Sequence, residues 1–251
     1  MKIFSRDDIF GTIFLFLFMG LLTLIPSFDH LDPISDALRD YETTDIVFST
    51  LQAEPPPDTN ITIVNIAREN RATLGKMLEI IGRYKSAVVG IDAFFRSEKG
   101  PAQDFPLMMG MSSIENLLLV SELDSASDDG QTWHKVNYSK PMFMQYANSG
   151  FANVITGEQT HGNYRTVRDF VPKFTVNDSL VPNFTARIVS YYDSSAYADL
   201  IKRKERLETI NWTGNYKKFF HLDVNDVLEE RFDPSIIKDK IILFGYIGDY
   251  V

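Results

Sequence analysis

The feature that most constrains this chain is the uncharged stretch of residues 9–28 near its N-terminus. An α-helix rises about 1.5 Å per residue, so twenty residues reach about 30 Å, the thickness of the hydrocarbon core of a bilayer. Four phenylalanines leave this stretch without the polar face of a surface helix: Phe10, Phe14, Phe16 and Phe18. We therefore predict one transmembrane helix, with residues 1–28 forming a cytoplasmic N-terminus and the anchor.

The charges on either side of this stretch predict its orientation. Lys2 and Arg6 precede it and Asp29 and Asp32 follow it, so the positive-inside rule places the N-terminus in the cytoplasm. A cleaved secretory signal is the alternative, but the stretch ends in LIPSF, which lacks the small-residue pattern of a cleavage site. In both cases the remainder is exported. We predict a single-pass protein of the inner (cell) membrane whose main domain is periplasmic or extracellular.

Charge and composition exclude several classes of function. The chain has 34 acidic and 25 basic side chains and a net charge of -9, so it lacks the positive field that nucleic acid requires. It contains no cysteine, which rules out disulfides, thiolate metal sites and cysteine nucleophiles. Its four histidines show no paired spacing, and no dinucleotide, P-loop or hydrolase-elbow motif is present. We predict no nucleic-acid partner, no metal, no cofactor and no enzymatic activity.

The first part of the exported chain has the pattern of a parallel α/β fold. Helical spacing of apolar residues predicts a membrane-proximal helix within residues 29–53, which the prolines at 55–57 end. Residues 61–66 and 87–92 are nearly continuous apolar runs of strand length. Residues 74–84, between them, place apolar side chains on one helical face. This order indicates a right-handed βαβ unit in a parallel sheet.

Later segments extend this pattern. We expect residues 150–155 and 166–176 to form an antiparallel pair of strands. The fold class is therefore α/β, with a mixed, mainly parallel sheet that is flanked by helices and preceded by one N-terminal transmembrane helix. Residues 54–251 form the extracytoplasmic domain. The other expected elements are a short helix over 105–114, strands over 116–121 and 241–245, and one or two helices over 184–207.

Four segments resemble, in the same order, the CHASE type-two domain, a family of extracytoplasmic sensory modules associated with bacterial cyclases and histidine kinases. They are residues 45–48, 61–95, 150–172 and 219–248. Each is short and mostly apolar, so the resemblance depends on their combination with an N-terminal anchor. It implies a ligand-sensing domain outside the membrane, ordinarily followed by more transmembrane helices and a cytoplasmic signalling enzyme. On that comparison we expect the domain to be truncated at its C-terminal end.

Three residues are candidate ligand contacts. Asp92 follows the second predicted strand, and the carboxyl ends of parallel strands line the binding crevice of open α/β sheets; the resemblance also places an aspartate there. Arg168 matches the family's pattern and, like Arg165, offers bidentate contacts to an anionic group. Asn65 ends the first strand, where the family usually has an acidic residue. The ordinary alternatives are an aspartate that turns the chain and an arginine paired with a carboxylate, and a pair between Asp92 and Arg168 fits both interpretations.

Two functions of different classes follow. The first is the sensory domain of a membrane-anchored bacterial receptor, which binds an unknown small molecule or envelope protein. Binding then favours one packing of the membrane-proximal helix across a homodimer and passes a signal to an effector outside this chain. The alternative is a cell-envelope binding or assembly module without signalling output. An anchored hydrolase needs a nucleophile and a base, which the sequence does not reveal.

Overall fold

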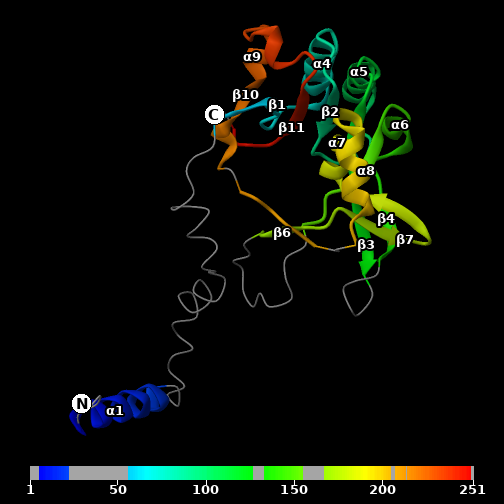
Figure 1. Cartoon of the computed structure of the whole chain (residues 1–251). Helices are drawn as coiled ribbons and strands as arrows, with labels where there is room; N and C mark the ends of the chain where they lie inside the picture. Colours follow the sequence, from blue (N-terminus) through cyan, green and yellow to red (C-terminus); the bar gives the residue numbers. More distant parts are fainter. Residues whose placement is uncertain are drawn as a thin grey trace. The chain divides into compact units, whose positions relative to one another are not determined.

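The computed structural model describes residues 6–22, 56–126, 133–154, 167–204, 207–212 and 214–249. The chain divides into two units. The described part of the first is the helix α1, Arg6–Leu22, and the second holds all the other described elements (Figure 1). The membrane-proximal helix expected within residues 29–53 lies outside the described residues.

Helix α1 shows that the N-terminal stretch is helical over residues 9–22, the part of it that the structure describes. Its side chains from Phe10 to Phe18 are exposed, and Phe14 and Phe16 are both 70% exposed. With about 3.6 residues per turn, these positions distribute apolar side chains around the whole helix. Among the helices that the structure describes, none combines the length and the apolarity needed to cross a bilayer. The prediction of a spanning helix is therefore not confirmed.

The second unit is built on one large sheet whose strand order is β10-β1-β11-β2-β3-β4-β7-β8, with β5 also paired to β3. The strands β10, β1, β11, β2, β3 and β5 pair in parallel, whereas β3–β4 and β7–β8 are antiparallel. This confirms the mixed, mainly parallel sheet. The bounds are β1 Asp58–Asn65, β2 Val88–Ile91, β3 Leu117–Ala126, β4 Trp133–Asn137, β5 Asn148–Phe151, β7 Lys173–Val176, β8 Ser179–Pro182, β10 Phe219–Leu222 and β11 Ile241–Gly245. A separate antiparallel ladder joins β6, Asp169–Phe170, to β9, Glu208–Thr209.

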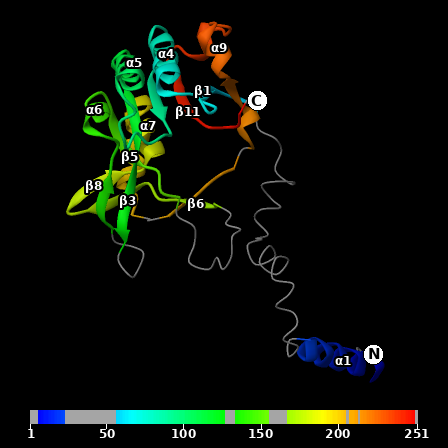
Figure 2. The same ribbon diagram turned by 180° about the vertical axis from the view of Figure 1, so that it is seen from behind.

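Helices cover both faces of the parallel part of the sheet. Successive side chains of a strand point to opposite faces; in β2, Val89 and Ile91 belong to the core beneath α4, whereas Val88 and Gly90 face α7. Figures 1 and 2 show α7 and α8, in yellow, on a different side of the strands from α4 and α5. The helices are α4 Arg71–Gly82, α5 Pro101–Ser112, α6 Pro141–Met144 and α9 Val224–Leu228 on one face, and α7 Phe184–Tyr192 with α8 Ser194–Lys202 packed on it. The short 3₁₀ helices η3, Tyr216–Lys218, and η4, Pro234–Ile236, complete the unit.

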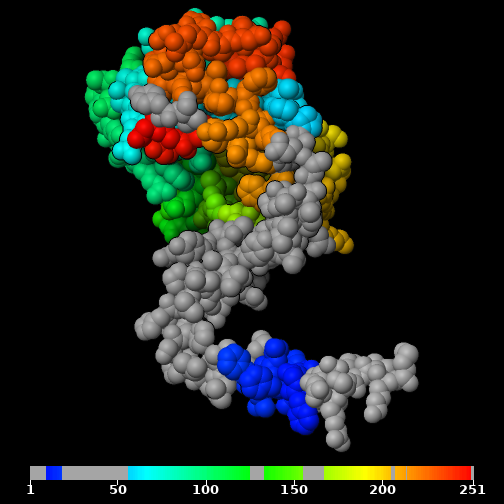
Figure 3. Space-filling model, turned by 90° about the vertical axis from the view of Figure 1, so that its left-hand side faces the viewer, coloured from blue at the N-terminus to red at the C-terminus, as the bar shows by residue number. Residues whose placement is uncertain are grey.

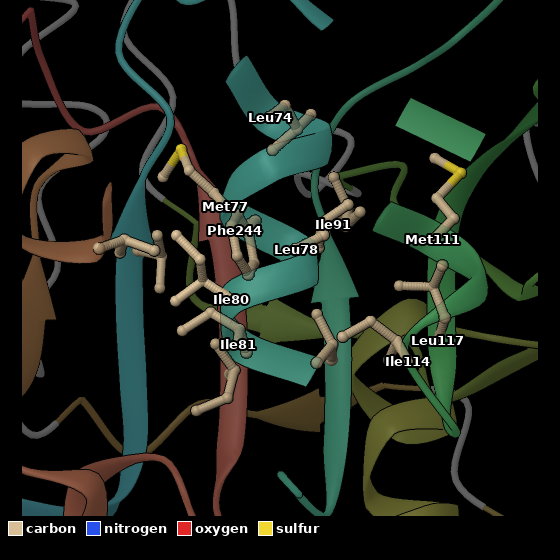
Figure 4. Close-up of a cluster of buried hydrophobic side chains, with 14 of the residues drawn as sticks. Leu74, Met77, Leu78, Ile80, Ile81, Ile91, Met111, Ile114, Leu117 and Phe244 are labelled. Carbon is tan, nitrogen blue, oxygen red and sulfur yellow. The ribbon is translucent and has the colours of Figure 1, made fainter. Parts of the chain in front are cut away.

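The larger core lies between α4, α5 and the parallel strands. Asn70 caps α4 by accepting a hydrogen bond from the Thr73 N–H at 3.0 Å. The helical spacing then directs Leu78 and Ile81 toward the sheet, where Phe244 of β11 is also fully buried (Figure 4). Burial of each such side chain contributes about 1.5–3 kcal/mol before the cost of ordering it. This face of α4 was predictable from its spacing alone.

Two features of the strand order differ from expectation. The last strand, β11, lies between β1 and β2 and pairs with both. The two strands of the predicted βαβ unit, β1 and β2, are therefore parallel but not adjacent in the sheet. The antiparallel pair expected for residues 150–155 and 166–176 is wrong. β5 runs parallel to β3, and β7 forms a hairpin with β8 instead. Asn177 and Asp178 both have positive φ, as the two-residue turn of a tight hairpin requires, so this local turn determines the pairing.

Helices α4 and α5 cross at a pair of glycines. A Cβ atom on Gly75 would collide with the backbone carbonyl of Pro106, and one on Gly110 would collide with the backbone of Gly75. Backbone atoms cannot move aside as the end of a flexible side chain can. Both positions therefore require glycine, because the two helix backbones lie too close together to leave room for a Cβ atom.

We expect Gly75→Ala to destabilise the domain by about 3 kcal/mol, because the helices must separate to accept the methyl group. The melting temperature of the full chain, followed by circular dichroism in detergent, should fall by roughly 5–10 °C. Gly11→Ala is the matched control, since nothing lies within 4 Å of its added methyl group in α1. An equal melting temperature for both variants would contradict the packing described here.

Candidate functional site

Two cavities open at the carboxyl edge of the parallel strands. The α4-side cavity, with a volume of about 460 Å³, is lined by residues that follow β1 and β2, including Glu69, Arg71 and Phe95. The α7-side cavity, of about 490 Å³, is lined by Asp92, Asn153, Asp169, Phe170, Phe184 and Ile210, among others. Open α/β sheets bind ligands at this edge. Both cavities are therefore candidate sites.

The structure places Asp92 one residue beyond β2, on the wall of the α7-side cavity. Its backbone N–H donates to the Phe244 carbonyl of β11 at 2.8 Å, which continues the sheet and fixes the side chain on the α7 face. The carboxyl group is exposed at the rim, yet burial by the surrounding protein raises its pKa above the ordinary value. Within the described residues, no hydrogen bond or ion pair engages this carboxyl group.

The amide oxygens of two asparagines on the cavity wall already accept structural hydrogen bonds. Asn153 binds both backbone groups of Leu123: its Oδ1 accepts from the N–H at 2.7 Å and its Nδ2 donates to the carbonyl at 3.0 Å. Asn183 caps α7 by accepting from the Thr185 N–H at 2.9 Å and from the Thr185 hydroxyl at 2.7 Å. The cap at residue 183 is visible in the sequence as an asparagine before a helical segment, but the role of Asn153 depends on distant residues.

Arg168 lies between two residues that line the α7-side cavity, Val167 and Asp169. Its carbonyl accepts a hydrogen bond from the Ile210 N–H at 2.8 Å, which continues the β6–β9 ladder. In the described part of the chain no ion pair joins Arg168 to Asp92, and Arg165 lies outside the described residues. Contact between Arg168 and an anionic ligand stays a prediction.

Asn65 ends β1 and is 1% exposed. Its Nδ2 donates to the Asp223 carboxylate at 2.8 Å and to the Gly248 carbonyl at 3.1 Å. Its Oδ1 accepts from the backbone N–H groups of Ala67 and Ile247, both at 3.1 Å. A side-chain amide has two donor hydrogens and two acceptor lone pairs, so these contacts use all of them. In this structure Asn65 joins the ends of three chain segments and has no polar group left for a ligand.

The α4-side cavity rests on a buried ion pair that sequence reasoning missed. Nη1 of Arg71 lies 2.5 Å from the Asp104 carboxylate and 2.7 Å from the Ser97 carbonyl. The guanidinium also stacks over the rings of Phe95 and Phe143, with distances of 5.4 and 5.2 Å to their centres. The ion pair ties the start of α4 to the first turn of α5, and the hydrogen bond to Ser97 ties it to the loop that follows β2. No local spacing indicates the ion pair, because 33 residues separate the partners.

The pKa of Asp104 reflects its surroundings. Burial raises this pKa, but the hydrogen bond from Arg71 and those from the Lys99 and Gly100 N–H groups, at 2.8 and 3.0 Å, outweigh burial and hold it below the ordinary value. Asp104 and Asp92 therefore represent opposite cases. One carboxylate has its charge satisfied inside the protein, and the other does not.

A family model for the CHASE2 domain matches residues 14–249, nearly the whole chain. The chain belongs to the CHASE2 family. CHASE2 domains are extracellular, non-catalytic sensory domains of signalling receptors, which is consistent with a sensory role here. No curated protein and no solved structure matches the chain. The resemblance found in the sequence is thus confirmed.

We expect Asp92→Asn to raise the melting temperature of this CHASE2 domain at neutral pH, by on the order of 1–2 °C. The raised pKa means that the folded state disfavours the ionised carboxyl group. The penalty develops as the pH rises from the ordinary carboxyl pKa, about 3.9, through the raised value, and asparagine removes it. The gain should therefore fade as the pH is lowered toward about 4. Thermal unfolding of the full chain across this pH range measures it.

Asp104→Asn is the matched comparison and should behave oppositely. Its lowered pKa contributes stability that is present above the ordinary carboxyl pKa and is lost as the pH falls through the lowered value. This substitution should therefore lower the melting temperature at neutral pH, and less so in acid. If both variants shift the melting temperature in the same direction at neutral pH, the assignment of one satisfied and one unsatisfied carboxylate is wrong.

Proposed function

We propose that this chain is the extracytoplasmic sensory domain of a membrane-anchored bacterial receptor and that it binds a small molecule in the α7-side cavity. The observation that carries the proposal is a cavity of about 490 Å³ at the carboxyl edge of the sheet, with Asp92 on its wall, whose carboxyl group has no partner among the described residues. Cavities of this size suit small organic ligands. Membership of a sensory, non-catalytic family favours binding over catalysis.

The proposed anchor is the uncharged stretch of residues 9–28. Helix α1 overlaps it from residue 9 to residue 22 and exposes apolar side chains over residues 10–18, including Phe10, Phe14 and Leu17. A helix that is apolar all round is stable when lipid or protein surrounds it. Basic residues before the stretch and acidic residues after it support an N-terminus in the cytoplasm and a main domain outside the membrane.

The proposed signal passes along neighbouring parallel strands. Asp92 is hydrogen-bonded through its backbone to β11, and β11 pairs with β1 from Ile61 to Asn65. β1 is the first strand after the proposed membrane-proximal helix, and it also pairs with the edge strand β10. Figure 3 shows the orange segment that contains β10 next to the light-blue start of this unit. A ligand that favours one arrangement of β2 and α7 can thus bias the segment that leads to the membrane, and across a homodimer this bias would reach an effector outside the chain.

Export of the main domain is the first requirement of this proposal. We expect alkaline phosphatase fused after Val251 to be active in bacteria, because that enzyme needs the disulfides that form only outside the cytoplasm. The fusion protein should also be recovered with the membrane fraction. Removal of residues 9–28 is the matched control and should abolish both properties. A fusion that is inactive although full-length, or one that remains membrane-bound and active without residues 9–28, would contradict the proposed anchor.

A further inference from the structure

We propose that the α7-side cavity binds a small organic cation, an amine or amidinium group attached to an apolar body. This inference rests on the proposed function and adds the chemical class of the ligand. It follows from the charges on the cavity wall, from the polar groups there that lack a partner, and from the apolar side chains around them.

The charge on the described part of the cavity wall is negative. Its described lining contains two carboxylates, Asp92 and Asp169, and neither a lysine nor an arginine. An anionic ligand would meet like charges, and these disfavour binding in a site that is partly shielded from water. The N-terminus of α7 also reaches the cavity, but the side chain of Asn183 already accepts from one N–H group of its first turn, that of Thr185. The helix end therefore has fewer N–H groups to offer an anion.

Asp92 is the carboxylate on the described wall that a ligand can satisfy. Asp169 accepts a hydrogen bond from the Thr209 hydroxyl at 3.1 Å, both ends of the Asn153 amide bind Leu123, and Oδ1 of Asn183 caps α7. The carboxyl group of Asp92 has no partner among the described residues, although the surrounding protein removes part of its water. A cationic ligand group supplies a charge-assisted hydrogen bond at this place.

The remainder of the wall fits the apolar part of such a ligand. Phe170, Phe184 and Ile210 line the cavity together with small aliphatic side chains. Aromatic rings attract cations over their faces and pack against apolar groups along their edges. The wall thus combines one carboxylate for the charged end with a larger apolar surface for the rest, as specific small-molecule sites do.

Three probes of similar size test the inference: 2-phenylethylamine, 2-phenylethanol and phenylacetate, which are cationic, neutral and anionic at pH 7. Isothermal titration calorimetry of the full chain in detergent should show that the amine binds at least about tenfold more tightly than the other two, a difference of about 1.4 kcal/mol. Asp92→Asn should remove this preference. Asp169→Asn is the matched comparison, because it neutralises the other carboxylate of the same wall, which already accepts from Thr209; it should weaken amine binding less than Asp92→Asn does.

Equal affinity for the amine and the alcohol, tighter binding of phenylacetate, or no binding of the amine overturns the cation assignment. A loss in Asp169→Asn but not in Asp92→Asn overturns the role given to Asp92. These results leave export of the domain untouched, since the fusion experiment tests it separately. Failure of the ligand class and failure of the proposed receptor are therefore distinguishable.

Discussion

The burial of the parallel sheet on both faces determines where this domain can carry chemistry. All four residues of β2 are buried, between α4 on one side and α7 on the other. A charged side chain inside such a strand would lose its water without gaining a partner. The charged side chains that line the two candidate cavities accordingly lie outside the buried strands, along the carboxyl edge of the sheet. Asp92, the residue directly after β2, is the first of this part of the chain to reach the carboxyl edge.

Some polar residues at the carboxyl edge of the sheet stabilise the fold, and another is available for binding. At the end of β1, Asn65 makes four hydrogen bonds that join distant segments. On the α4 side, Arg71 and Asp104 neutralise each other below the surface, and removing one partner would leave a buried charge. On the α7 side, the carboxyl group of Asp92 has no such compensation in the described part of the chain. This contrast separates groups that hold the fold together from the group that is available to a ligand.

The sequence predicted the elements that follow from local spacing. The apolar runs of β1, β2, β3 and β11 and the single apolar face of α4 are visible without knowledge of their partners. The position of Asp92 was predictable for the same reason, because it depends only on where a strand ends. The position of β11 between β1 and β2, and the hairpin of β7 with β8, depend on long-range pairing or on a turn that was not recognised. The ion pair of Arg71 and Asp104 and the hydrogen bonds of Asn65 likewise join residues that are far apart in sequence, so no spacing rule reveals them.

The ionisation of Asp92 tests this account most directly. A ¹³C NMR titration of carboxyl-labelled aspartate in the full chain, assigned with the Asp92→Asn variant, measures the pKa of this one group. We expect a pKa above the ordinary value of about 3.9 in the free protein, and a lower pKa once a cationic ligand is bound, because a nearby positive charge favours the ionised form. A pKa at the ordinary value in the free protein would show that the cavity does not disfavour the charge of Asp92, and a lower one would show that the group already has a partner. The cavity would then lack the unsatisfied carboxylate on which its assignment as the ligand site depends.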